Sequence, residues 1–309
     1  MKFLINLHFL PRGKIPDATV IANIPATSEA TPTVLDTRQF PPLLLRMSEV
    51  AIERDDDLEM RFKVDDKTLT TIAGSMFDLL PNNFSLLAKS RLFYNIYNRS
   101  VGAKTDVKTF FSLWVIKATV AHKLRYNIPL TPDEQKLNRD LGISDTVEKG
   151  LLPLPLKEQI SREYQIIQEE THSFLFANVP TAGVYVETLH PLPNQFLVLT
   201  KISADCGAAV GRNIRVAVDR DYVSDYVEFP SWALGIVPAT SLSKEISCFI
   251  PALKELRIKL KATGADVNIN VRFTVWKCAM TNLFRARWGL ATRDELPGDT
   301  YDKVMAGVL

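Results

Sequence analysis

Two runs of alternating polar and apolar residues near the end of the chain constrain its fold most strongly. They cover residues 255–262 and 266–276, and only Thr263-Gly264-Ala265 separates them. Successive side chains of a β-strand point to opposite faces. One face therefore carries Leu256, Ile258, Leu260, Val267, Ile269, Val271, Phe273 and Val275, and the other carries Arg257, Lys259, Lys261, Asn268, Asn270 and Arg272. The pattern predicts an antiparallel hairpin with one buried face and one solvated face.

The sequence before this hairpin, from Thr171 onward, also favours β-structure. Apolar runs at 173–179, 183–189, 196–204, 213–220, 226–229 and 244–250 are separated by segments rich in Pro, Gly and Asn. About eight strands with regular turns indicate an antiparallel β-sandwich, either a jelly roll or an Ig-like fold. We therefore predict a sandwich domain over residues 171–280 and a C-terminal tail with a short helix over 281–309.

The middle of the chain, residues 69–170, is predicted to be helical. Val107, Phe111, Trp114, Ala118 and Ala121 recur at helical spacing. Thr131-Pro132-Asp133-Glu134 has the order of an N-cap, a proline in the first turn and acidic residues after it. A charged segment from Leu156 to Glu170 is predicted to be a further helix. No internal repeat is evident, and the fold class expected for the whole chain is α+β.

Residues 1–68 are predicted to form an extended arm followed by a second hairpin. Six prolines lie between Pro11 and Pro42, and proline favours extended backbone. The arm carries apolar residues for contact with a neighbouring surface, namely Val20, Ile21, Ile24, Val34 and Leu35. A flexible linker is the alternative. The second hairpin is expected from residues 46–53 and 58–64, where Leu58, Met60, Phe62 and Val64 share a face.

Composition excludes several classes of protein. The net charge of +2 gives no overall attraction to nucleic acid or anionic lipid. Cys206, Cys248 and Cys278 are too far apart for a paired-cysteine zinc motif, and buried free thiols in a reducing compartment fit them best. The chain has no apolar run of about 18 residues, so we expect no transmembrane helix and no membrane partner.

Motifs that would indicate catalysis are also missing. The sequence has neither a Walker loop nor a strand–GxGxxG–helix unit, and it lacks a Gly-x-Ser-x-Gly nucleophile turn. Asp219, Asp221 and Asp225 form the best acidic cluster, but Arg220 lies among them, which favours a neutralised turn over a calcium site. We therefore expect no catalytic residue, cofactor or metal, although a hydrolase with an unfamiliar acidic site stays an alternative.

Two surface features are candidates for binding. Arg257, Lys259, Lys261 and Arg272 form a basic stripe in the predicted hairpin, suited to phosphate backbones or acidic protein surfaces. Its structural alternative is a solvated face that keeps the sheet soluble. Trp232 lies in an apolar loop, where its ring could stack on a sugar.

A β-sandwich with an extended arm resembles the virion structural proteins of bacteriophages in architecture, without a motif that matches residue by residue. The resemblance implies a structural subunit of a symmetric assembly, such as a capsid, neck or tail component. Its partners would be copies of itself and other assembly subunits, with nucleic acid as a weaker partner. It would be located in the virion if phage-encoded, and otherwise in the cytoplasm. A carbohydrate- or receptor-binding module is the alternative.

The alternation in residues 255–276 generates a testable prediction about stability. Ile258→Ala and Val271→Ala should each lower the free energy of unfolding by about 2–5 kcal/mol, because each removes a buried branched side chain. Lys259→Ala should change it by less than about 0.5 kcal/mol. Denaturant titration checks both values, and a larger loss for Lys259→Ala would show that the faces are reversed.

Overall fold

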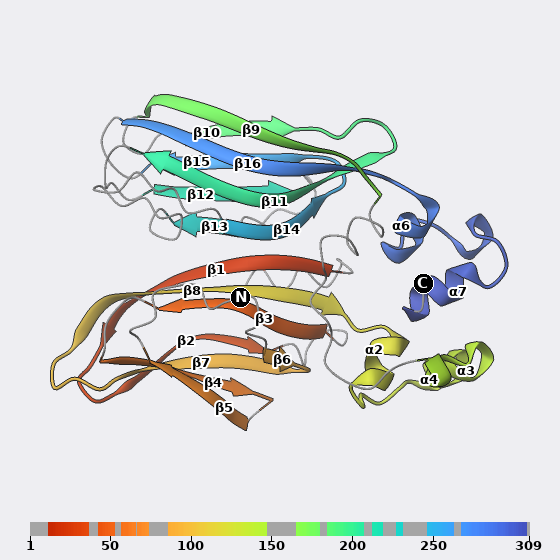
Figure 1. Ribbon diagram of the computed structural model, residues 1–309, viewed down its shortest axis with the longest axis horizontal. Helices are drawn as coiled ribbons and strands as arrows, with labels where there is room; N and C mark the ends of the chain where they lie inside the picture. The colour runs from red at the N-terminus through yellow and green to blue at the C-terminus, as the bar shows by residue number, and fades with distance from the viewer. Residues whose placement is uncertain are drawn as a thin grey trace.

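A computed structural model of the protein shows a mostly β-structured chain with a few short helices (Figure 1). It describes residues 12–36, 43–52, 57–65, 67–73, 86–146, 165–179, 184–206, 212–218, 227–230, 246–262 and 267–307. All strand pairs in these ranges are antiparallel. The strands form two sandwiches that lie beside each other and share one long sheet.

The first sandwich contains eight strands from the N-terminal part of the chain. They are β1 (Arg12–Ile24), β2 (Glu29–Asp36), β3 (Leu43–Ile52), β4 (Leu58–Val64), β5 (Lys67–Ala73), β6 (Leu86–Ala88), β7 (Arg91–Asn98) and β8 (Lys104–Lys117). One sheet has the order β6-β3-β8-β1, and the facing sheet has the order β2-β7-β4-β5. This order of eight strands in two sheets is that of a jelly roll.

The second sandwich repeats this order with the next eight strands. They are β9 (Ile166–Val179), β10 (Val184–Leu189), β11 (Gln195–Cys206), β12 (Arg212–Val218), β13 (Val227–Pro230), β14 (Ile246–Ala252), β15 (Leu256–Ala262) and β16 (Val267–Ala279). Their sheets have the orders β14-β11-β16-β9 and β10-β15-β12-β13. Each strand occupies the place of the strand numbered eight lower, so the chain is a tandem repeat of one topology.

Short sequence matches fall at equivalent places in the two sandwiches. Phe111-Ser-Leu-Trp114 in β8 corresponds to Phe273-Thr-Val-Trp276 in β16, and Val20-Ile-Ala-Asn-Ile-Pro25 corresponds to Leu175-Phe-Ala-Asn-Val-Pro180. The strand registers agree with this alignment. Lys14 pairs with Trp114 and Ile21 with Val107, while Glu169 pairs with Trp276 and Phe176 with Ile269. The expectation that the chain has no internal repeat is therefore wrong.

The two sandwiches join through β1 and β14, which makes one eight-stranded sheet. The ladder between them contains a single residue pair, Lys14 and Phe249. Side chains supply the rest of the joint, because the ring of Phe249 lies 5.7 Å from that of Trp114 and 6.3 Å from that of Trp276. Aromatic packing between the repeated tryptophans thus connects the two halves.

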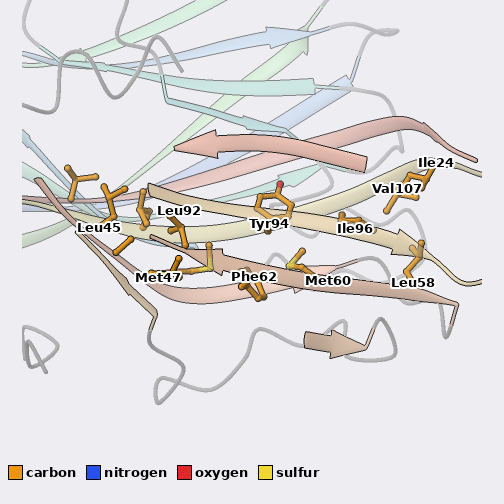
Figure 2. Packing of buried hydrophobic residues seen from close by; sticks show 14 residues of the cluster. Ile24, Leu45, Met47, Leu58, Met60, Phe62, Leu92, Tyr94, Ile96 and Val107 are labelled. Atoms are coloured by element: carbon orange, nitrogen blue, oxygen red, sulfur yellow. The ribbon is translucent and has the colours of Figure 1, made fainter. Parts of the chain in front are cut away.

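Alternating side chains build the core of the first sandwich (Figure 2). Leu58, Met60, Phe62 and Val64 project from one face of β4 and are at most 5% exposed. They pack against β7 and β8, where the hydroxyl groups of Tyr94 and Thr109 are 3.0 Å apart and satisfy each other inside the core. The face predicted for β4 is therefore confirmed.

Short helices gather at one end of both sandwiches (Figure 1). They are α2 (Val120–Arg125), α3 (Pro132–Leu141), α4 (Ile143–Thr146), α6 (Asn282–Arg287), the 3₁₀ helix η1 (Arg293–Glu295) and α7 (Thr300–Ala306). The predicted start of α3 is confirmed, since the Thr131 side chain accepts from the Glu134 amide and Pro132 stands in the first turn. The short helix predicted in the C-terminal tail is also present.

The C-terminal helix is held closely against the start of α2. Gly307 ends α7 with a left-handed φ of 82°, and a Cβ there would lie 2.2 Å from the Thr119 hydroxyl. Thr119 is the N-cap of α2 and accepts from the His122 amide. The chain after β16 is thereby fastened to the chain that leaves β8.

Both predicted hairpins are wrong in their pairing, although their strands exist. β15 pairs with β10 and β12, whereas β16 pairs with β9 and β11 in the other sheet. β3 and β4 likewise belong to different sheets. Alternation identifies the buried face of a strand but not its partner. The apolar faces of β15 and β16 meet across the sandwich instead of lying side by side.

The helical prediction for residues 69–170 is wrong for much of its length. β6, β7, β8 and the beginning of β9 occupy most of the described residues outside α2, α3 and α4. β8 was misread because both its faces are buried: Leu113 and Val115 enter the core, while Trp114 and Ile116 enter the cluster at the joint. Residues 156–164 of the predicted charged helix lie outside the described residues. The division of the chain into the four parts 1–68, 69–170, 171–280 and 281–309 as separate folding units stays a prediction.

The extended arm is an integral part of the first sandwich. Val20, Ile21 and Ile24 belong to β1, and Val34 and Leu35 belong to β2. Ile24 is fully buried within the chain's own core. Pro32 is tolerated because β2 is an edge strand and because the register of β2 shifts at this point, between Ala30 and Thr33. The prediction of an arm that docks elsewhere is therefore corrected.

The aromatic joint generates the second prediction. Phe249→Ala should lower the free energy of unfolding by about 3–5 kcal/mol, because a ring that is 2% exposed leaves a cavity between two tryptophans. Val101→Ala is the matched control, since that side chain is 96% exposed and its loss should cost less than about 0.5 kcal/mol. Urea titration followed by tryptophan fluorescence measures both, and equal midpoints would show that the joint does not depend on Phe249.

Candidate functional site

Among the strands that the structure describes, two have an open edge on the same side of the second sandwich. β9 is the last strand of the eight-stranded sheet, and β10 is the last strand of the facing sheet (Figure 1). An edge strand presents backbone N–H and C=O groups that no neighbour in its own sheet satisfies, so it is a natural place for another chain to pair. β9 is also long, with 14 residues.

The two edge strands and the loop after β10 expose large apolar side chains. The exposed fractions are 56% for Ile167 and 66% for Leu175 in β9, 50% for Val186 in β10 and 62% for Leu192 in the loop after β10. We call β9, β10 and these four residues the β9–β10 flank. Soluble proteins usually protect an edge with prolines or outward-pointing charges. The apolar residues here leave the flank suited to contact with another protein surface.

Carboxylates of β9 are engaged by the neighbouring strand β16. Trp276 Nε1 donates to Glu169 Oε2 at 2.7 Å, and Lys277 Nζ donates to Glu170 Oε1 at 2.6 Å. The hydrogen bond from Lys277 holds the pKa of Glu170 below its ordinary value. These acidic groups therefore carry out a structural role within the sheet.

A histidine and two phenylalanines close the interior beside this ion pair. His172 Nε2 is 3.4 Å from the second oxygen of Glu170. Its ring stacks at 5.3 Å on Phe273 and at 6.3 Å on Phe174. The imidazole covers the aromatic core near the edge, and the residues that these contacts join include no hydroxyl and no thiol group.

The predicted basic stripe is divided between the two sheets. Arg257 and Lys259 lie on the outer side of β15, opposite in phase to the buried Leu256, Ile258 and Leu260. Arg257 is paired with Glu255 at 2.5 Å. Lys261 occupies the next position of the same phase in β15, whereas Arg272 is exposed on β16, in the other sheet. Trp232 and the acidic cluster at residues 219–225 lie outside the described residues.

The part of the chain that the structure describes offers no site for metal binding or thiol chemistry. No group of three or more His, Cys, Asp or Glu residues there could hold a metal ion. Cys248 and Cys278 are buried free thiols, as predicted. Burial raises the pKa of Cys278 to about 12, which keeps it a protonated thiol. None of the described helices has the length and apolar character needed to cross a membrane.

Comparison with known proteins yields distant structural similarity only. No family model and no curated protein matches the chain. The STIV MCP matches at 9% identity over 85% of this chain and 96% of that chain, with a TM-score of 0.24. The major capsid protein P2 from bacteriophage PM2 matches at 9% identity over 88% and 99%, with a TM-score of 0.23. The CUB1-EGF-CUB2 domain of human MASP-1/3 matches at 10% identity over 84% and 99%, with a TM-score of 0.26.

The structurally similar proteins include viral capsid proteins and other β-sandwich proteins. Identities and TM-scores this low assign neither an activity nor a partner to the chain. What the molecule does has to be argued from its own surface, and the β9–β10 flank is the feature of that surface which departs most from an ordinary solvated sheet.

The Glu170–Lys277 pair generates a prediction about pH. The folded-state pKa of Glu170 is depressed, so the stability it adds is present above its unfolded pKa, about 4.3, and is lost as the pH falls through the folded value. Glu170→Gln should therefore reduce the free energy of unfolding at pH 7 by about 0.5–1 kcal/mol, a difference that shrinks as the pH falls below about 4.3 and disappears once Glu170 is protonated in the folded protein.

The control for this prediction is a double-mutant cycle. Lys277→Gln alone and together with Glu170→Gln separates the pair energy from the effect of each side chain. Urea titrations of the unmodified protein, the two single variants and the double variant supply four free energies of unfolding at pH 7 and four more at low pH. A Glu170→Gln deficit of the same size at both pH values would contradict the role of the ion pair.

Proposed function

We propose that the protein is a structural subunit of a symmetric assembly and that the β9–β10 flank is one of its subunit contacts. The observation that carries the proposal is the long open edge of β9 together with exposed Ile167, Leu175 and Val186. Burying these side chains and pairing the edge would both be favourable, since apolar burial contributes about 25 cal/mol per Å² of apolar surface. Water already satisfies the backbone groups of the edge, so pairing the edge adds only a modest net gain per hydrogen bond to the gain from apolar burial.

The shape of the chain supports the same function. Two jelly rolls in tandem present flat sheets and two far edges, an arrangement suited to repeated lateral contacts. Jelly rolls occur in viral capsid proteins, lectins and cupins, so the fold alone leaves the class of function open. The exposed flank favours assembly over ligand binding, and a virion component such as a capsid, neck or tail protein is the finer proposal.

Carbohydrate or receptor binding is the second candidate function. It rested on Trp232, and no observation among the described residues adds to it. Glycan screening with a Trp232→Ala control separates the two functions, because an assembly subunit needs no sugar to associate. Electron microscopy of the purified protein would show directly whether regular particles form.

Charge placed on the flank should prevent assembly without unfolding the protein. Leu175→Asp and Val186→Asp each put a carboxylate where the contact needs an apolar surface, and an unpaired buried charge is costly. We expect association at least about tenfold weaker, which corresponds to about 1.4 kcal/mol. Analytical ultracentrifugation at matched concentrations measures it, with circular dichroism as the check on folding.

Val101→Asp is the matched control, because Val101 is 96% exposed in the loop between β7 and β8 and lies away from the flank. It should assemble as the unmodified protein does. If the unmodified protein stays monomeric at high concentration, or if Leu175→Asp assembles equally well, the proposed function is wrong.

A further inference from the structure

The internal repeat indicates which surface meets the β9–β10 flank. Counted within each sandwich, the long sheet has the strand order six-three-eight-one twice in succession. The joint between the sandwiches brings strand one of the first half, β1, beside strand six of the second half, β14. The two free ends of the sheet are therefore β6 and β9, which are again a sixth and a first strand.

We propose that the partner of β9 is β6 of another copy of this chain, held by a repeat of the internal joint. This inference rests on the proposed function and names the partner surface for it. The sheet would then continue from β9 of one copy into β6, β3, β8 and β1 of the next. Each copy contributes a different edge, so the contact is heterologous and the assembly closes as a ring or extends as a filament.

The equivalences can be carried to single residues. Lys14 and Glu169 are equivalent because each pairs with the repeated tryptophan, Trp114 or Trp276. Two residues beyond each tryptophan, Ile116 pairs with Arg12 and Cys278 pairs with Ile166, so Arg12 is equivalent to Ile166, and the register shift leaves Ile167 as an extra residue of β9. On the other side, Arg46 and Val198 pair with the same two tryptophans.

The edge strands next to these residues then correspond as well. Leu87 of β6 pairs with Arg46, and Pro251 of β14 pairs with Val198, so Leu87 and Pro251 are equivalent. In the joint Lys14 stands opposite Phe249, and the antiparallel direction of the strands sets Arg12 opposite Pro251. Repeating the joint between copies sets Ile166 of one chain opposite Leu87 of the next.

The chemistry of β9 beside this pair fits a contact better than it fits solvent. Ile167 is 56% exposed, although it is an aliphatic residue on an edge strand. The adjacent carboxylates of Glu169 and Glu170 have partners in β16, so they do not oppose the approach of another strand. β6 is only three residues long, and the internal joint between β1 and β14 likewise contains only a short ladder. Side-chain packing would complete both contacts.

Disulfide trapping between two differently sized versions of the full chain tests the proposal. One version carries Ile166→Cys and the other, enlarged by a fused tag, carries Leu87→Cys. Directly opposed residues of neighbouring antiparallel strands have Cα atoms about 4.5–5.5 Å apart, which a disulfide can span. We expect a crosslinked heterodimer in the oxidised mixture and a ladder of higher species from a chain with both substitutions.

The controls separate this inference from the function on which it rests. The unmodified chain, whose described cysteines Cys248 and Cys278 are buried, should form no ladder. A homodimer from Ile166→Cys alone would show that β9 contacts β9, and the head-to-tail pairing would be wrong. Association by ultracentrifugation without crosslinking in the mixture would overturn the pairing but leave the proposed function standing. Absence of association would overturn both.

Discussion

The packing of Phe249 between Trp114 and Trp276 is the interaction on which the rest of the structure depends. A single ladder pair between β1 and β14 would be a weak connection between two sandwiches of this size. The three rings bury apolar surface from both halves at once, and Leu44, Phe196 and Phe284 extend the same cluster toward the helices. Because each half supplies one of the repeated tryptophans, neither half completes this cluster alone.

The helical end reinforces the joint from outside. Phe284 of α6 stacks on Phe196 of β11, with ring centroids 3.9 Å apart, and on Trp288 at 5.1 Å. Farther along, Gly307 packs against Thr119 at the start of α2. The segment after β16 thus passes from the second sandwich back to the first. These contacts fix the orientation of the two sandwiches relative to each other. A subunit that binds its neighbours through two complementary edges requires such a fixed orientation.

Much of the local structure could be predicted from sequence because local patterns have local causes. The buried faces of β4 and β15 follow from alternation, and the start of α3 follows from Thr131 and Pro132. Prediction failed where burial on both faces hides the alternation, as in β8. It also failed where proline lies on an edge strand, because prolines in the sequence suggested an arm. An edge strand tolerates proline, since a lost N–H donor costs little where no neighbour accepts from it.

The sequence by itself determined the β-structure of the second half, the faces of its better-patterned strands, the burial of Cys248 and Cys278, the start of α3 and the short helix of the C-terminal tail, whereas the α+β class expected for the whole chain gave way to a mostly β structure. Only the tertiary structure decided which strands pair, because alternation is the same whether the next strand lies beside or across the sandwich. It also decided that the chain is a tandem repeat, since the matching motifs are too short to align without strand register. The candidate contact was likewise invisible in the sequence, because only the strand order places β9 at the end of its sheet.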